Sequence, residues 1–189
     1  MLVDIKDLHI TFQTNNGSFD AVRGVSLSLG KEKFGIVGES GSGKSLTARC
    51  LMNLLPSSAK GRAETLSFDG IDLRNASEKQ MRQIRGKRVG FILQDPKYSL
   101  NPVMPIGKQV AEAWQTHKSG SKKQAMNAAI ELLDQVRIRE PHKVAERYAH
   151  AVSGGMGQRV MLAMMLAPDP ELMFADGPTR ALDAPLQAD

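Results

Sequence analysis

Apolar and polar residues alternate through the first part of the chain, which is the pattern of strands that bury one face. The alternation covers residues 2–12 and resumes at 21–22 and 25–29, with turn-forming residues at 14–17 in between. A short apolar run at 33–37 predicts a buried strand that leads into a segment rich in glycine and serine. The N-terminal region is therefore expected to be rich in β-strands.

The rest of the chain combines helical periodicity with short apolar runs. Helices are expected at 45–55, over 106–148 with breaks at Ser119-Gly120 and Glu140-Pro141, and from a Ser153 cap to residue 167. Further strands are expected at 64–68, 88–93 and 172–175. This order predicts an α/β chain in which a helical region is inserted between two sheet-forming segments.

Length and charge narrow the possible partners. The 189 residues are enough for one sizeable core, and the net charge is +5. The basic residues are spread along the chain and have no interleaved aromatic residues to stack on bases. A solvated, mildly basic surface is favoured, and no nucleic-acid partner is expected.

Cysteine content and hydropathy indicate the compartment. Cys50 is the single cysteine, so no intrachain disulfide can form, and its place on the expected helix predicts a small apolar core residue. The apolar run at 160–167 is far too short to cross a bilayer, and the N-terminal residues lack the layout of a signal peptide. A cytosolic protein is expected.

Residues 38–45 fit every fixed position of the pattern G-x-x-x-x-G-K-[ST], a phosphate-binding loop. Its glycines allow successive backbone N–H groups to turn toward one anion, and the following helix adds its N-terminal partial charge. The expected ligand is a nucleoside triphosphate with Mg²⁺, held by Gly38, Glu39, Ser40, Gly41, Ser42, Gly43, Lys44 and Ser45, and kinases, GTPases and ATPases all fit this loop. The alternative is a glycine-rich surface turn, which the strand–loop–helix context disfavours.

Two further segments are candidates for binding phosphate groups or their metal ion. The apolar run 172–175 ends in Asp176, which is the Walker B layout and would place an Mg²⁺ ligand opposite Ser45. The alternative is a buried strand followed by a solvated aspartate. Residues 152–159 place Ser153, Gly154 and Gly155 at a helix N-terminus, which makes a second anion site. Two such sites in one chain suggest that it dimerises.

The segment 152–159 resembles the signature loop of ABC-type ATPases, and the resemblance extends over essentially the whole chain. It implies a P-loop NTPase fold of the ABC type, with an N-terminal antiparallel β region and a mainly parallel core sheet. A helical subdomain would lie between the Q-loop and the signature motif. Within one incomplete nucleotide-binding domain, 1–93 and 168–189 would form the ATP-binding core and about 94–167 the helical subdomain.

The same resemblance assigns roles to single residues. Gln94 matches the Q-loop, which contacts Mg²⁺ and the attacking water, and Asp183 matches the D-loop at the subunit interface. Phe12, or less favourably Phe19, matches the aromatic residue that stacks on adenine. The alternative, equally favoured, is that either residue is simply a core residue of a strand. Gln158 joins Ser153, Gly154 and Gly155 among the expected nucleotide contacts, made to ATP on a partner ATPase subunit in a homodimer or heterodimer.

The residues around the motifs resemble those of one branch of this family, the oligopeptide, dipeptide and nickel importers. The similarity lies in residues 35–40, 94–96, 99–104 and 153–156. It implies an ATP-binding subunit that works beneath two transmembrane permease subunits, at the inner face of the membrane. A non-transport ABC ATPase is the alternative, disfavoured because the chain has no tandem cassette, coiled-coil insertion or basic nucleic-acid face.

The chain also departs from the family pattern. Gly177 follows Asp176 where the family carries a glutamate that polarises water, a contribution of roughly 10²- to 10⁴-fold in rate. Arg180 and Pro185 flank the D-loop unusually, and Val152 replaces the usual leucine. The sequence stops at Asp189 with no histidine at the position of the family's switch histidine, so a C-terminally truncated copy is expected. ATP binding is predicted to be intact and hydrolysis deficient.

Overall fold

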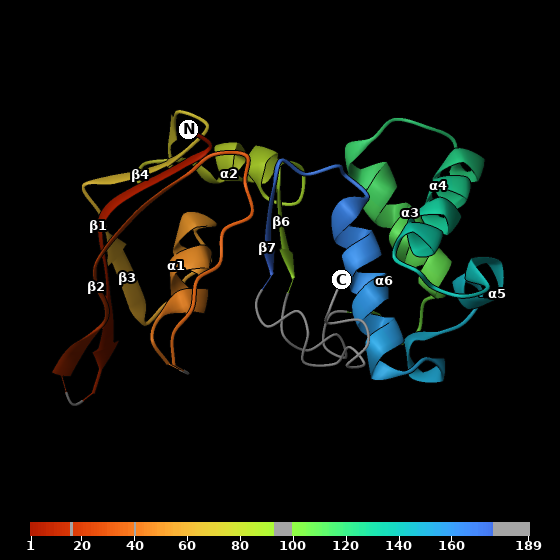
Figure 1. The fold of residues 1–189 in the computed structure, drawn as a ribbon, viewed down its shortest axis with the longest axis horizontal. Helices are drawn as coiled ribbons and strands as arrows, with labels where there is room; N and C mark the ends of the chain where they lie inside the picture. Colours follow the sequence, from red (N-terminus) through yellow and green to blue (C-terminus); the bar gives the residue numbers. More distant parts are fainter. Residues whose placement is uncertain (16, 40, 93–99, 176–189) are drawn as a thin grey trace. The chain divides into compact units, whose positions relative to one another are not determined.

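The computed structural model describes residues 1–15, 17–39, 41–92 and 100–175 (Figure 1). The chain divides into two compact units, Met1–Arg82 and Gln83–Asp189. The predicted division into an ATP-binding core of 1–93 and 168–189 and a helical subdomain stays a prediction.

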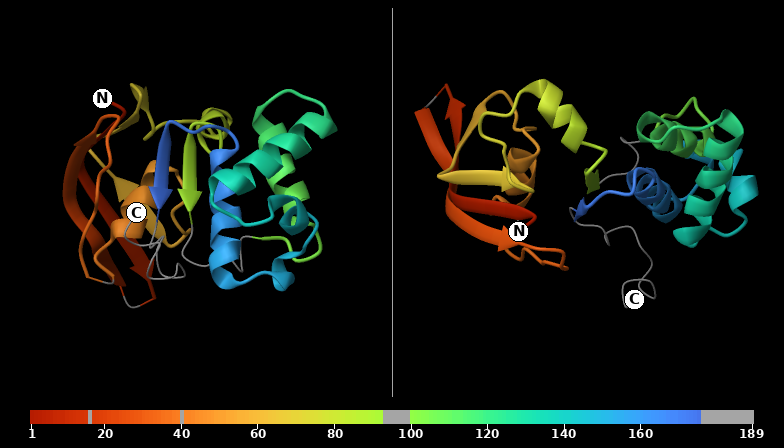
Figure 2. Two further views of the ribbon diagram at one scale, coloured as in Figure 1. Left: turned by 45° about the vertical axis from the view of Figure 1, so that its right-hand side comes forward. Right: turned by 90° about the horizontal axis from the view of Figure 1, so that it is seen from above.

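The first unit is built on a twisted antiparallel sheet (Figures 1 and 2). Strands β1 (Val3–Thr14) and β2 (Gly17–Leu29) form a long hairpin, which confirms the predicted strands and the turn between them. Strands β3 (Ala59–Arg62) and β4 (Thr65–Phe68) both pair with β1, and β5 (Ile71–Asp72) pairs with β4. The short strands β3 and β5 were not expected from the sequence.

The alternation along β1 produces a buried face, as predicted. Val3, Ile5, Leu8 and Ile10 are at most 3% exposed. The alternation is interrupted at Asp7, which has a φ of 50° where the register with β2 shifts between Ile5 and Leu8. A β-bulge of this kind restores the apolar residues to the core side after the interruption.

Helix α1 (Lys44–Leu51) lies beside β4 and places Cys50 and Leu51 in the interior. Burial raises the pKa of the Cys50 thiol to about 11, so this residue packs as a small apolar group, as predicted. The helix ends before the predicted residue 55 because Asn53 adopts a left-handed conformation, with a φ of 51°, and Leu54 donates back to the Arg49 carbonyl. A second helix, α2 (Glu78–Ile84), was not predicted.

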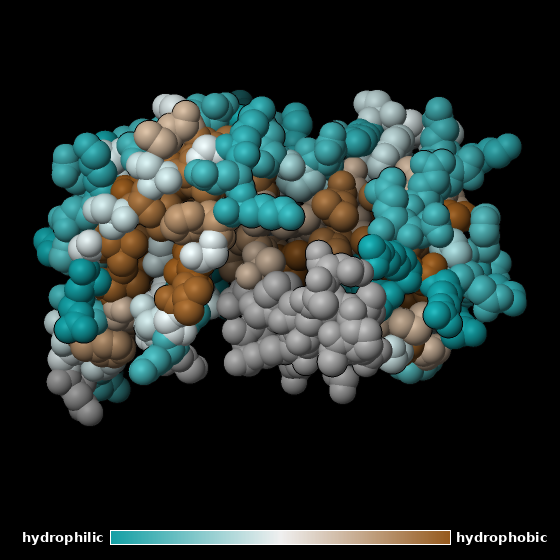
Figure 3. Space-filling view, in the orientation of Figure 1, coloured by the Kyte–Doolittle hydropathy of each residue, from teal (hydrophilic) through white to brown (hydrophobic). Residues whose placement is uncertain are grey.

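The buried strand predicted at 33–37 does not form. The segment is irregular, and Phe34, Ile36 and Val37 are 52%, 44% and 97% exposed. A strand requires a neighbour that accepts and donates its backbone hydrogen bonds, and no strand among the described residues pairs with this segment. These three side chains are among the large apolar side chains that are exposed to solvent. Figure 3 shows apolar residues among hydrophilic ones on one face of the molecule.

The second unit contains a parallel pair of strands, β6 (Val89–Ile92) and β7 (Leu172–Ala175), in register from Val89 with Leu172 to Ile92 with Ala175. Both strands were predicted, but β7 is only half-buried, because among the described strands it pairs with β6 alone. Gly90 allows close packing, since a Cβ there would lie 2.7 Å from the Met173 sulfur.

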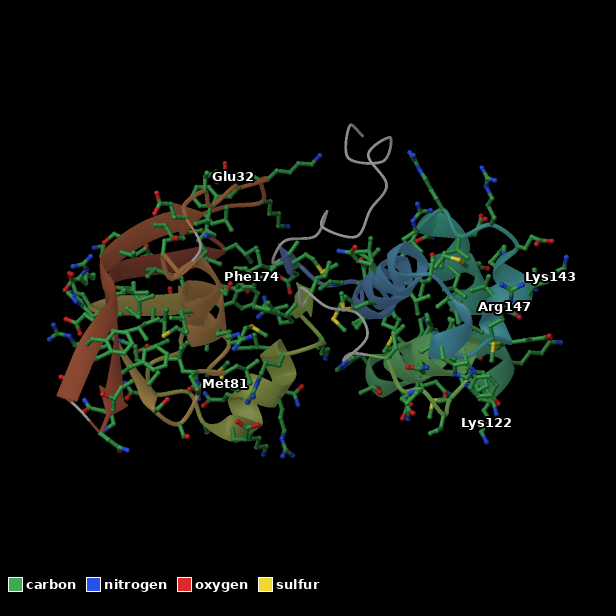
Figure 4. All side chains as sticks on the ribbon, turned by 90° about the horizontal axis from the view of Figure 1, so that it is seen from below. Glu32, Met81, Lys122, Lys143, Arg147 and Phe174 are labelled. Carbon is green, nitrogen blue, oxygen red and sulfur yellow. The ribbon has the colours of Figure 1, made fainter. Side chains whose placement is uncertain are left out.

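The remaining helices of this unit pack around one apolar core. They are α3 (Ile106–His117), α4 (Lys122–Gln135), α5 (Pro141–Ala145), the short 3₁₀ helix η2 (Ala149–Ala151) and α6 (Gly154–Leu166). The helix break predicted at Ser119-Gly120, the helix start at Pro141 and the cap at Ser153 are confirmed, whereas α4 already ends at Gln135, before the predicted break at Glu140-Pro141, and α5 ends at Ala145. Ile106, Val110, Leu133 and Val160 are fully buried, whereas Lys122, Lys143 and Arg147 extend outward (Figure 4).

Throughout the described ranges, every helix is too short or too polar to span a bilayer.

Candidate nucleotide-binding site

The loop that precedes α1 has a backbone that only glycine adopts easily at two positions. Gly41 and Gly43 have φ values of +86° and +91°, in the left-handed region. Between them, the Ser42 N–H donates a hydrogen bond of 3.2 Å to the Glu39 carbonyl, which closes a tight turn. Two of the glycines predicted to hold phosphate are therefore required by the shape of the loop.

Gly43 also fixes where the loop lies. It caps α1 and approaches β2 so closely that a Cβ would be 2.6 Å from the Val22 Cγ2 and 3.1 Å from the Ala21 carbonyl oxygen. The register of β1 and β2 shifts at this point, because Ile10 pairs with Val22 and Thr11 with Asp20. Ala21 is thus an extra residue in β2, and this bulge receives the loop.

Lys44 folds back across the loop. Its Nζ donates hydrogen bonds of 2.8 Å to the Gly38 carbonyl and 2.7 Å to the Glu39 carbonyl, and lies 3.3 Å from the Ser42 Oγ. The ammonium group is thereby held within the turn, and the glycines around it are exposed except for Gly43. A fixed cation beside a helix N-terminus and an open backbone loop favour an anionic ligand.

Ser45 is half-buried in the first turn of α1, directly after Lys44. Thr47 follows on the buried side, where its hydroxyl donates to the Gly43 carbonyl at 3.0 Å. No group of three or more histidine, cysteine or acidic side chains is arranged to hold a metal in the part of the chain described. The assignment of Mg²⁺ to Ser45 with Gln94 and Asp176 stays a prediction.

The two aromatic candidates for adenine stacking lie together. Phe12 and Phe19 occupy paired positions of β1 and β2, and their rings stack with centroids 5.4 Å apart and an angle of 8° between planes. Phe12 is half-buried, and Phe19 is 55% exposed. The sequence presented these residues as alternatives, whereas the structure makes them one aromatic pair.

The second candidate anion site lies at the start of α6. Ser153 caps this helix by accepting a hydrogen bond of 3.3 Å from the Met156 N–H. No atom lies within 4 Å of a Cβ built at Gly154, and Gly155 is half-buried. Gln158, by contrast, is only 4% exposed. The helix N-terminus is capped as predicted, and the nucleotide contacts assigned to these four residues stay predictions.

Several predicted site residues lie outside the described residues. They are Ser40, Gln94, Asp176, Gly177 and Asp183.

Sequence reasoning missed the part that β2 plays in shaping the site. The adjacent apolar residues Ala21 and Val22 break the alternation of β2 and are the available sign of the bulge. The buried hydroxyl of Thr47 was missed as well, because threonine at that position in a helix has no distinctive pattern.

Comparison with known proteins places this loop in a family. The family model described as "ABC transporter" matches residues 22–180. The oligopeptide transport ATP-binding protein OppD of Bacillus subtilis (strain 168) is 48% identical over 190 residues, covering 99% of this chain and 53% of that protein. The dipeptide transport ATP-binding protein DppD of Escherichia coli (strain K12) is 44% identical over 188 residues, covering 99% of this chain and 58% of that protein. The chain spans about half the length of these curated relatives.

Solved structures that resemble this chain are also ABC cassettes. A dimeric bacterial ABC transporter cassette matches with a TM-score of 0.87 at 26% identity, over 99% of this chain and 78% of that one. A dimeric ATP-binding cassette in a post-hydrolysis state, bound to ADP and Pi, matches with a TM-score of 0.83 at 26% identity, over 97% of this chain and 77% of that one. The α/β fold class with antiparallel N-terminal strands is confirmed, and the chain belongs to the ABC transporter family.

Proposed function

We propose that this chain binds ATP with Mg²⁺ at residues 38–45. The observation that carries the proposal is the position of Lys44, whose ammonium is held inside a turn of left-handed glycines at the start of α1. Backbone N–H groups of such a loop, the N-terminus of α1 and the Lys44 charge together suit a chain of phosphates.

The residues of the loop also fit a magnesium ion. The Ser45 hydroxyl follows Lys44 in the first turn of α1, and a serine or threonine at this position ligates Mg²⁺ in phosphate-binding loops. Gln94 and Asp176 would complete the protein ligands, as the family resemblance implies. When bound, Mg²⁺ neutralises charge on the β- and γ-phosphates.

At the level of the cell, we propose that the chain is the ATP-binding subunit of an importer for peptides. The names of the OppD and DppD relatives support this substrate class, and nickel is the other substrate of the branch that the sequence resembles. In this proposal, two ATPase subunits pair so that the Ser153 loop of one closes over the ATP of the other. The pair acts on two permease subunits from the cytoplasmic side of the membrane.

Nucleotide binding is tested by replacing the loop cation. We expect Lys44→Ala to lower the affinity for a fluorescent ATP analogue at least tenfold, because hydrogen bonds from charged donors contribute about 1.5–3 kcal/mol each. Titration of the purified 189-residue chain measures this change.

The matched control is Lys79→Ala, which removes an exposed lysine from α2 in the same unit. Lys79→Ala should bind the analogue like the unmodified chain. Equal affinity in all three proteins would overturn the assignment of the phosphate site.

Hydrolysis is proposed to be deficient in the site built on this chain's own loop. Gly177 offers no acceptor at the position where the family carries its glutamate. We expect ATP turnover close to background, and a partial gain in Gly177→Glu, measured as phosphate release with Lys44→Ala as the control for contaminating ATPase. Brisk turnover by the unmodified chain would contradict this part of the proposal.

A further inference from the structure

The Phe12–Phe19 pair lies in a part of the hairpin that is fixed on both sides. On one side, the Thr11 hydroxyl donates a hydrogen bond of 2.6 Å to Asp20 across the strands. On the other side, the Thr14 hydroxyl donates one of 2.7 Å to the Gly17 carbonyl. The relative position of the two rings is therefore set by cross-strand bonds as well as by stacking.

This aromatic pair also lies close along the chain to the phosphate-binding loop. Phe19 precedes the bulged residue Ala21 by two positions, and the Ala21 carbonyl and Val22 side chain are the atoms that Gly43 approaches. Two residues of strand span roughly 7 Å. The rings and the loop are thus attached to the same short stretch of β2.

Core packing does not account for Phe19. Its side chain is 55% exposed, and its ring is nearly parallel to the Phe12 ring. The Phe19 ring therefore covers one face of the Phe12 ring. An aromatic ring stacked in this way limits the orientations that Phe12 can adopt before a ligand binds. Less side-chain entropy of Phe12 is then lost when a ligand binds.

We propose that Phe19 is a positioning residue for the base of the nucleotide: it fixes the plane of the Phe12 ring, on which the base stacks. This inference rests on the proposed binding of ATP at residues 38–45 and on the expected stacking of the base on Phe12. Stacking of a base on an aromatic ring is strong enough to affect affinity and is sensitive to ring orientation. Phe19 therefore contributes to binding of the base and not to binding of the phosphates.

The test compares two ligands by calorimetry on the whole chain: Mg²⁺–ATP, and Mg²⁺ with inorganic tripolyphosphate, which has no base. We expect Phe19→Ala to weaken ATP binding about fivefold, the size of an aromatic pair interaction, and to leave tripolyphosphate binding unchanged. Phe12→Ala should weaken ATP binding further, and Lys44→Ala should weaken the binding of both ligands.

Conservative variants separate positioning from general support of the hairpin. Phe19→Tyr keeps the flat ring and should bind ATP like the unmodified chain, whereas Phe19→Leu keeps an apolar side chain without the ring and should resemble Phe19→Ala. The inference is overturned if Phe19→Ala weakens both ligands equally, which indicates a loosened hairpin, or if it weakens neither. If the unmodified chain binds neither ligand, the proposed function itself fails, and this inference fails with it.

Discussion

The N-termini of α1 and α6 are both preceded by glycine and serine, yet they are built differently. At α1, the cap is Gly43, which is left-handed, makes no side-chain cap hydrogen bond and packs tightly on β2. At α6, the cap is Ser153, whose hydroxyl accepts from Met156, and the adjacent Gly154 has open space around it. The first end is fixed by tertiary packing, and the second is capped by its own sequence.

This difference bears on how each end meets a ligand. The loop at α1 already holds its cation, Lys44, against its own carbonyls, so the groups for phosphate binding are gathered within one unit. The start of α6 presents exposed Ser153 and Gly154 and a capped turn. An open end of this kind suits contact with a partner's nucleotide, which is the role proposed for it.

The largest effect is expected from Gly43→Ala. A Cβ would meet Val22 at 2.6 Å, and alanine is strained at a φ of +91°. We expect the free energy of unfolding to fall by about 2 kcal/mol and ATP binding to be lost with the loop geometry. Urea unfolding followed by circular dichroism and titration with an ATP analogue measure the two effects.

Gly70→Ala is the matched control for Gly43→Ala. Gly70 also has a positive φ, of 76°, but no atom within 4 Å of its missing Cβ. It should cost about 1 kcal/mol from backbone strain alone and leave ATP binding intact. If Gly43→Ala were no more harmful than Gly70→Ala, packing on β2 would not be what fixes the loop.

An intermediate effect is expected from Ser153→Ala. Loss of the helix cap should cost about 1 kcal/mol, and ATP binding by the single chain should not change. Fluorescence of Trp114, the single tryptophan, reports unfolding of the unit that contains α6, because its ring packs against the core of that unit.

Ser121→Ala removes an equivalent cap, at the start of α4, where the Ser121 hydroxyl accepts from Gln124. Both serine variants should lose similar stability and retain ATP affinity. Weaker ATP binding in Ser153→Ala but not in Ser121→Ala would mean that Ser153 contacts the nucleotide of its own chain, and the comparison of the two ends would fail.

The smallest effect is expected from Gly154→Ala. A Cβ at this position meets no atom within 4 Å, and the backbone is not left-handed there. We expect a change in stability within about 0.5 kcal/mol and no change in ATP affinity, measured by the same unfolding and titration experiments. A large loss of stability would show that this end is packed as tightly as the end at Gly43.

The sequence predicted those features that depend on near neighbours in the chain. The turn at the tip of the β1–β2 hairpin, the break before α4 and the Ser153 cap are each specified by a few adjacent residues. The same holds for the phosphate-binding loop, whose glycines and lysine stand at fixed spacing. For such features, backbone preference and local hydrogen bonds decide the outcome.

Prediction from the sequence was wrong where strand formation depends on pairing with residues far apart in the chain. The apolar run at 33–37 has the composition of a buried strand, but none of the described strands pairs with it, and its backbone is irregular and its side chains are exposed. Strands β3 and β5 were missed for the opposite reason. They are short and weakly patterned, and they form because β1 and β4 provide edges for them.

The sequence by itself determined that a glycine-rich loop with Lys44 precedes a helix, and that Ser153 begins another. Only the tertiary structure decided that Gly43 must be glycine for lack of space as well as for its φ, that Ala21 bulges toward the loop, and that Phe12 and Phe19 form one pair. The reason is physical: dihedral preferences and caps act over a few residues, whereas strand register and close packing join residues far apart in the chain.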